Sequence, residues 1–179
     1  NCVANSRIIE ASGFDSVFIQ PSAHDAGTSL GAAQWVSHAI HKIPRPADKM
    51  HTDYLGPEYT SEEIQTELDR AQRSYRIVAD PSDEAARLIA EGKIVGWFQG
   101  KAELGPRALG DRSSLADPRR PEMKDTLNHR VKHREAFRPF APSVLEEACG
   151  DLFSSAVPSP FMLRVYETLP HKREVIPAV

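Results

Sequence analysis

One run of this sequence, residues 100–120, restricts the possible folds more than any other, because it suits neither a helix nor a strand. It reads GKAELGPRALGDRSSLADPRR and combines glycine and proline with four arginines. Glycine lets a backbone approach a ligand closely, proline fixes the chain direction, and the planar arginine fork matches two oxygens of a phosphate or carboxylate. The run is typical either of a solvated loop or of an anion pocket, and its surroundings must decide between the two.

Positive charge is concentrated around this run. From Gln99 to Arg138 there are ten Lys and Arg residues against six Asp and Glu, although the whole chain of 179 residues has a formal net charge of −3. A negative total argues against a protein that binds nucleic acid by bulk electrostatics, since that requires a cationic surface. The local excess favours a discrete anion site.

The remaining composition indicates an ordinary folded protein. With 40% hydrophobic and 26% charged residues, the chain can bury one good core or two small ones. Cys2 and Cys149 lack the spacing of a disulfide framework or a zinc site, which fits a reducing cytoplasm. No apolar run is long enough to span a bilayer, and no signal peptide is recognisable. The chain begins without Met and stops abruptly at Val179, so we expect a fragment of a longer protein.

The order of predicted elements is that of an α/β or α+β fold. Residues 16–21, 75–79, 94–98, 140–145 and 161–167 have the composition of short strands. Helices are predicted from about Thr28 after a glycine-bearing turn, over 60–68 from a capping box, over 81–92 behind Asp80 and Pro81, and over 121–132. Residues 44–60 hold three prolines and a glycine without periodicity and are interpreted as an interdomain connection.

Three cations stand out as candidate anion ligands. Arg107 lies between Pro106 and Ala108, and Arg138 is flanked by prolines and aromatic residues that would exclude water. Together with Lys132 they could hold a doubly charged phosphate group. The alternative is that the basic residues are solvated or form weak surface ion pairs with Glu103, Asp111, Asp117 and Glu135, and we favour it for Arg119, Arg120 and Arg130.

Asp25 is a further candidate, in the turn PSAHDAG that precedes a helix entrance of small residues. A carboxylate there could hold a divalent cation or touch a nucleotide. An aspartate before glycine is also common as a turn or cap residue. We do not assign its neighbour His24 to the same metal, because adjacent side chains usually diverge.

Two stretches carry a family resemblance. Residues 100–147, from GKAELGPRALG through NHRVKHREAFRPFAPSVLEE, resemble the C-terminal part of the NodU/CmcH carbamoyltransferases. NCVANSRI and residues 18–33 resemble the end of that family's N-terminal, actin-like ATPase domain. Lys101 and Asp111 depart from the family's usual Arg and Asn, so neither is carried over as a contact.

The resemblance implies an actin-like remnant over 1–43, a linker with a short helix over 44–70, and an incomplete YrdC-like domain with a mixed sheet over 71–179. It implies that Arg107, Lys132 and Arg138 contact carbamoyl phosphate and act in catalysis. It also implies that Asp25 is a metal ligand and Asn1 an ATP contact, with ATP as co-substrate and iron or magnesium as the divalent metal of the full-length protein.

The implied activity is that of an O-carbamoyltransferase. Carbamoyl phosphate and ATP would form carbamoyl-adenylate, and the carbamoyl group would pass to a hydroxyl of a natural-product or sugar acceptor. The alternatives are a non-catalytic RNA- or nucleotide-binding YrdC-like module, and threonylcarbamoyl-adenylate synthesis for tRNA modification. The acceptor and the oligomeric state are not readable from the sequence.

Overall fold

The structure is a computed structural model that describes residues 1–47, 50–155 and 157–179. It has α/β composition, as predicted, with helices and one two-stranded antiparallel sheet in the described part of the chain. The chain forms two compact units. The first contains Asn1–Glu58, Gln99–Arg112 and Ser159–Val165, and the second contains Tyr59–Phe98, Ser113–Pro158 and Tyr166–Val179. The domain boundaries expected from the sequence stay a prediction.

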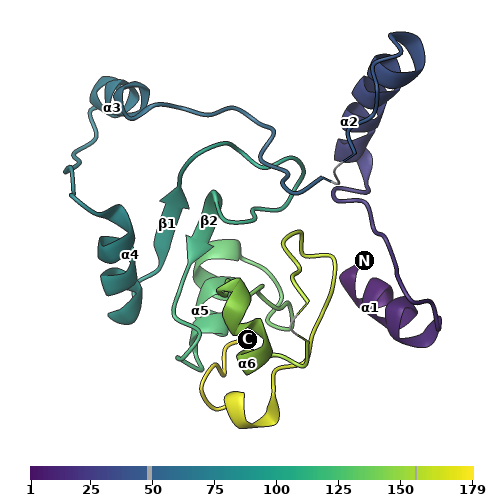
Figure 1. Cartoon of the computed structure of the whole chain (residues 1–179). Helices are drawn as coiled ribbons and strands as arrows, with labels where there is room; N and C mark the ends of the chain where they lie inside the picture. The colour runs from purple at the N-terminus through teal and green to yellow at the C-terminus, as the bar shows by residue number, and fades with distance from the viewer. Residues whose placement is uncertain (48–49, 156) are drawn as a thin grey trace. The chain divides into compact units, whose positions relative to one another are not determined.

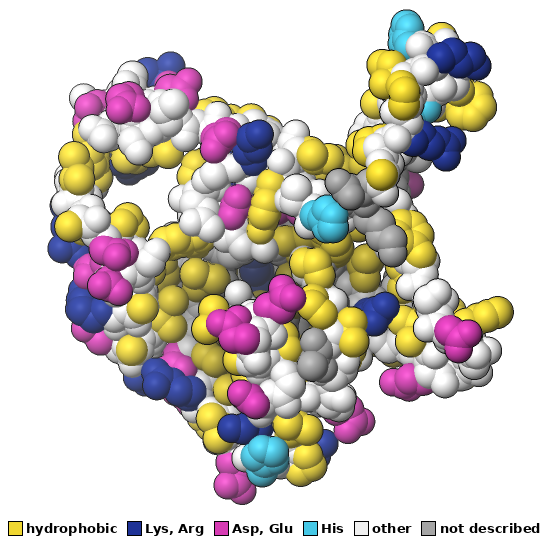
Figure 2. Space-filling view, viewed as in Figure 1, with side chains coloured by type: hydrophobic (Ala, Val, Ile, Leu, Met, Phe, Trp, Pro, Cys, Tyr) yellow, Lys and Arg dark blue, Asp and Glu magenta, His cyan; other side chains and the backbone are white. Residues whose placement is uncertain are grey.

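The first unit contains two helices, α1 (Cys2–Ala11) and α2 (Asp25–Trp35), and α2 continues into a π-helical turn, η1 (Val36–Ile40). Asn1 caps α1, since its Oδ1 accepts from the amides of Val3 and Ala4 at 3.1 and 3.2 Å. No residue of α1 or α2 is buried within the described range 1–47, and Figure 2 shows hydrophobic side chains open to view over α2.

The second unit opens with two helices whose starts follow the expected caps. In α3 (Ser61–Arg70), Thr60 and Glu63 form the predicted capping box, with bonds of 2.8 and 3.2 Å between each side chain and the other's amide. In α4 (Pro81–Ala90), Asp80 Oδ1 accepts from the amides of Ser82 and Asp83 at 2.8 and 3.0 Å. Local capping therefore places both helices.

Strand β1 (Val95–Phe98) confirms the strand predicted over 94–98 and pairs with β2 (Arg112–Leu115), as Figure 1 shows. The chain then forms α5 (Met123–Leu127) and a π-helical turn, η2 (Asn128–Lys132), which together confirm the helix predicted over 121–132. The remaining elements are the 3-10 turn η3 (Glu146–Ala148), helix α6 (Cys149–Leu152) and the 3-10 turn η4 (Pro170–Lys172).

A small hydrophobic core lies beside the sheet. Met123, Leu127 and Ala178 are buried together, and Ile94, Ala116 and Phe140 pack against them. This cluster anchors α5, and through α5 it supports the basic segment that follows.

Four of the predicted strands are wrong. Residues 16–21, 75–79, 140–145 and 161–167 form no strand in the structure. A strand requires a hydrogen-bonding neighbour, and apolar composition cannot supply one. Leu163 and Val165 instead bond to side chains of α1, with Asn5 Nδ2 donating to Leu163 O at 3.0 Å and Ser6 Oγ accepting from Val165 N at 2.8 Å.

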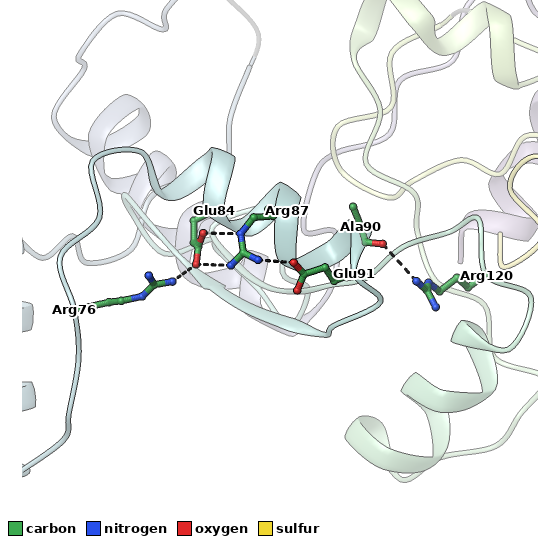
Figure 3. A network of polar contacts seen from close by, with 6 residues as sticks. All are labelled: Arg76, Glu84, Arg87, Ala90, Glu91 and Arg120. Atoms are coloured by element: carbon green, nitrogen blue, oxygen red, sulfur yellow. Dashed lines mark hydrogen bonds and ion pairs between the residues drawn. The ribbon is translucent and has the colours of Figure 1, made fainter.

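A chain of ion pairs lies on the exposed face of α4 and connects it to Arg76. Glu84 accepts from Arg76 and Arg87, Arg87 also bonds Glu91, and Arg120 Nη2 donates to Ala90 O at 3.4 Å, all drawn in Figure 3. On the face shown in Figure 2, acidic and basic side chains are mixed over α3 and α4. No helix in the described residues is both long enough and apolar enough to cross a membrane.

Candidate functional site

The Arg107 loop, residues 99–111, closes around one carboxylate in the first unit. Glu103 Oε1 accepts from the backbone amides of Leu109 and Asp111, both at 2.8 Å, and from that of Arg112 at 3.3 Å. Burial by itself raises the pKa of Glu103, but these backbone donors outweigh it and hold the pKa below its usual value. An ionised glutamate therefore anchors both ends of the segment that carries Arg107.

A second segment fixes the same loop from outside. Ala102 and Leu104 donate their amides to Pro57 O and Asp53 O at 2.9 and 2.7 Å, and Gly56 N donates to Ala102 O at 2.8 Å. These contacts come from the proline-containing stretch that we interpreted as a connection. The stretch thus has a structural role that its composition does not reveal.

Tyr54 and Asp53 extend this contact. Tyr54 Oη donates to Leu109 O at 3.2 Å, and the Asp53 side chain is buried near Glu103 and Asp111. Desolvation raises the pKa of Asp53, and the negative charges of Glu103 and Asp111 raise it further. The loop is therefore bordered by carboxyl groups whose pKa values are displaced in opposite directions.

The PSAHDAG turn meets the Arg107 loop within the first unit. Ser22 Oγ donates to Leu104 O at 3.0 Å. Gly105 has φ +102°, and a Cβ there would lie 3.0 Å from Ser22 Oγ and 3.3 Å from His24 Nε2. A side chain at position 105 would be both strained and crowded, which explains the glycine. The PSAHDAG turn and the Arg107 loop, which are far apart in the sequence, are therefore in direct contact.

Arg107 is exposed, and its guanidinium forms no hydrogen bond or ion pair with residues 1–47, 50–155 or 157–179. Arg112, five positions later, is held by backbone carbonyls, including Gly100 O at 3.1 Å and Asp111 O at 3.0 Å. Arg107 is therefore available to a ligand, whereas Arg112 maintains the shape of the loop.

Lys132 and Arg138 lie at the two ends of a second basic segment, in the second unit. Lys132 is exposed and has no partner among the described residues. Arg138 forms only a long ion pair, 3.9 Å from Glu135, between side chains that are 43% and 62% exposed. Such a pair contributes little, so both cations are available.

The alternative interpretation of the arginines holds for Arg119 and Arg120. Arg119 Nε and Nη2 donate to the two carboxylate oxygens of buried Asp117, each at 2.8 Å, and Arg120 lies 3.9 Å from the same group. Hydrogen bonding from Arg119 is the main reason why the pKa of Asp117 is lowered. Arg130 is exposed.

The two remaining candidates, Asp25 and Asn1, have fewer contacts that indicate a binding site. Asp25 is exposed at the first position of α2, and no group of three His, Cys, Asp or Glu side chains comes together among the residues described. The assignment of Asp25 to a metal stays a prediction. Asn1 Oδ1 is occupied by its capping bonds. A surface cavity of about 460 Å³ lies beside the PSAHDAG turn and is lined by Gln20, Ser22, His24, Thr28, Gly31 and Gln34, among others.

The expected ligand cage of three cations stays a prediction. Arg107 belongs to the first unit, and Lys132 and Arg138 belong to the second. Sequence reasoning missed three residues that hydrogen-bond to the backbone of the segments carrying these cations, namely Glu103, Tyr54 and Asn128. From the sequence, Glu103 is interpreted only as a surface ion-pair partner, and a carboxylate two residues before a Gly-Pro-Arg turn is the signal that indicates a loop anchor.

Comparison with known proteins places two family models on the chain. The Carbamoyltransferase C-terminus matches residues 86–179, and the Carbamoyltransferase N-terminus matches residues 1–34. The chain is 45% identical to Nodulation protein NolO of Bradyrhizobium diazoefficiens over 86% of its length. It is 41% identical to Nodulation protein NolNO of Sinorhizobium fredii over 100% of its length, and 39% identical to Nodulation protein U of Rhizobium tropici over 98%. It spans only 27–28% of these three relatives.

Proposed function

This chain belongs to the carbamoyltransferase family. We propose that it is part of an O-carbamoyltransferase that uses carbamoyl phosphate and ATP to carbamoylate a hydroxyl of a small molecule. The proposal includes carbamoyl-adenylate as the intermediate and a natural product or sugar as the acceptor. It also includes a YrdC-like fold for the C-terminal part and an actin-like origin for the N-terminal part.

One observation carries the proposal: Arg107 is exposed and has no partner in the described chain, although its loop is anchored by Glu103. A fixed loop lowers the entropy lost when a cation binds its ligand. An arginine that the protein does not use for its own structure is suited to an external anion. The same availability of Lys132 and Arg138 supports their assignment to the same ligand.

The chemistry assigned to these residues is electrostatic. Arg107, Lys132 and Arg138 would bind the phosphate oxygens of carbamoyl phosphate and stabilise the charge that develops as phosphate leaves. Such a role requires no covalent nucleophile. Asn1 would meet the nucleotide through its Nδ2, since its Oδ1 caps α1. The proposal keeps iron or magnesium as the divalent metal of the full-length protein, with Asp25 as one ligand, and assigns no step to it.

Calorimetry on the chain tests the proposal with carbamoyl phosphate, ATP and inorganic phosphate titrated separately. We expect carbamoyl phosphate to bind, and Arg107→Ala to weaken its binding about tenfold or more, the usual effect of losing a charge-assisted contact. Lys101→Ala is the matched control, because Lys101 is an exposed cation of the same loop and is not assigned to the ligand. Equal losses in the two variants would show that only net charge matters.

The same titrations separate the alternatives. An RNA-binding module would lose affinity steeply with salt for many nucleic acids, whereas a specific phosphate site would select carbamoyl phosphate. Threonylcarbamoyl-adenylate synthesis would require threonine and bicarbonate instead. For the whole enzyme, Arg107→Ala is expected to abolish ATP/pyrophosphate exchange that depends on carbamoyl phosphate, and near-normal exchange would refute the role of Arg107.

A further inference from the structure

Asn128 is the one fully buried large side chain among the described residues, with 0% of its surface exposed. It follows the core residue Leu127 directly and opens the turn η2 that ends at Lys132. A buried carboxamide without partners would be costly, because it offers two donors and an acceptor that water can no longer satisfy. The hydrogen-bond partners of this carboxamide therefore indicate the structural role of Asn128.

The Asn128 side chain is bonded to the segment that leads to Arg138. Its Oδ1 accepts from Arg134 Nε at 2.7 Å, and its Nδ2 donates to Arg138 O at 3.1 Å and to Ala136 O at 3.4 Å. We call residues 133–138 the Arg138 loop. One carboxamide thus contacts the beginning, middle and end of this loop.

The backbone of Asn128 holds the near end of the same loop. Its carbonyl accepts from the amides of His133 and Arg134, the latter at 3.1 Å. His133 has φ 47°, the left-handed conformation that turns the chain away from the helix. Lys132 is therefore the last residue before a turn that closes on Asn128.

Arg134, which is bonded to Asn128, also contacts the residues that follow the Arg138 loop. Its guanidinium lies 4.5 Å from the centre of the Phe140 ring, and its Nη2 donates to Pro139 O at 3.3 Å. Phe140 packs against the core that contains Leu127. Arg134 is thus a structural arginine, and with Asn128 it connects the loop to the core.

We propose that Asn128 is a positioning residue that fixes the directions of Lys132 and Arg138 for a phosphate-bearing anion. This inference rests on the proposed function. Asn128 Nδ2 donates to the backbone carbonyl of Arg138 itself. A substitution at Asn128 would therefore shift the backbone from which the Arg138 side chain extends. Asparagine suits the position because it donates and accepts at once. Aspartate would lose both donated bonds, and serine is too short to reach both sides.

Calorimetry with carbamoyl phosphate on the full chain tests the proposal, together with NMR signals of the arginine Nε–H groups. We expect Asn128→Ser to bind about tenfold or more weakly, since small displacements of a binding group cost affinity steeply. The Arg138 Nε–H signal should respond to carbamoyl phosphate in the wild-type chain and lose that response in the variant.

Leu127→Ala is the control for a merely structural effect. It removes a buried side chain of α5 that makes none of the Asn128 hydrogen bonds, so it should lower the melting temperature but keep the affinity within about twofold when measured well below the transition. If Leu127→Ala weakens binding as much as Asn128→Ser, the positioning role is overturned. If Asn128→Ser does not fold, Asn128→Asp takes its place, because it keeps the volume and the acceptor for Arg134.

The two proposals fail in different ways. Wild-type binding together with unchanged binding by a folded Asn128 variant overturns the positioning role and leaves the proposed function standing. A wild-type chain that does not bind carbamoyl phosphate overturns the proposed function, and the positioning role with it.

Discussion

The arginines of the basic region differ in what they contact, although their sequence surroundings are similar. Arg119 is bonded to Asp117, and Arg134 is bonded to Asn128 and stacked on Phe140. Arg107 is exposed and has no partner in the part of the chain that the structure describes. The chain thus uses some guanidinium groups to hold loops and leaves others available, which is the division that an anion site requires.

Glu103 leads to a prediction about pH. Its pKa is lowered, so the stabilisation that it gives the Arg107 loop is complete above the ordinary glutamate pKa and is lost as the pH falls through the lower, folded-state value. We expect the amide chemical shifts of Leu109 and Asp111 to move with that titration in the wild-type chain and to lose this step in Glu103→Gln.

Asp53 provides the internal control for the same NMR titration. Its pKa is raised mainly by burial, so its step should lie above the ordinary aspartate pKa and vanish in Asp53→Asn. A Leu109 shift that follows the Asp53 step, and persists in Glu103→Gln, would contradict the role given to Glu103.

Among the elements, the starts of α3 and α4 followed the expected local signals, α2 began at Asp25 rather than near Thr28, and most strand predictions failed. Capping at Thr60 and Asp80 depends on side chains within three residues of the amides that they bind. The segment 75–79 has strand composition, yet Ile77 is 79% exposed and no strand pairs with it in the described residues. Apolar periodicity shows that a segment is able to form a strand, and the partner decides whether it does.

The cap of α4 can be tested directly. Asp80→Ala removes the acceptor for two amides and should lower the free energy of unfolding by about 0.5–2 kcal/mol, measured by urea denaturation. Asp80→Ser restores a capping oxygen and should recover most of the loss. If alanine and serine are equally destabilising, the hydrogen bonds of the cap are not the cause.

For the whole molecule, the order of segments along the chain does not follow the division into units. Residues 99–112 belong with Asn1–Glu58, although the chain on either side of them belongs to the second unit. The Arg107 loop is accordingly held in two ways, by Glu103 within the loop and by residues 53–57 from a distant part of the chain.

Removal of residues 1–58 should separate these two contributions. Ala102 and Leu104 donate to Pro57 and Asp53, so their amides should lose protection from hydrogen exchange. Leu109 and Asp111 donate to Glu103 and should keep theirs, as should the core residue Leu127, which serves as the reference. Uniform loss of protection throughout the loop would contradict the independent role of Glu103.

Local features of this protein can be read from its sequence. The helix caps at Thr60 and Asp80, the irregular run around Arg107 and the family to which the chain belongs all depend on residues close together in the chain. The pairing of residues 53–57 with the Arg107 loop, the enclosure of Asn128 and the choice of free or bonded arginines required the folded structure. These features depend on hydrogen bonds between partners that become neighbours only when the chain folds, and no local pattern specifies such partners.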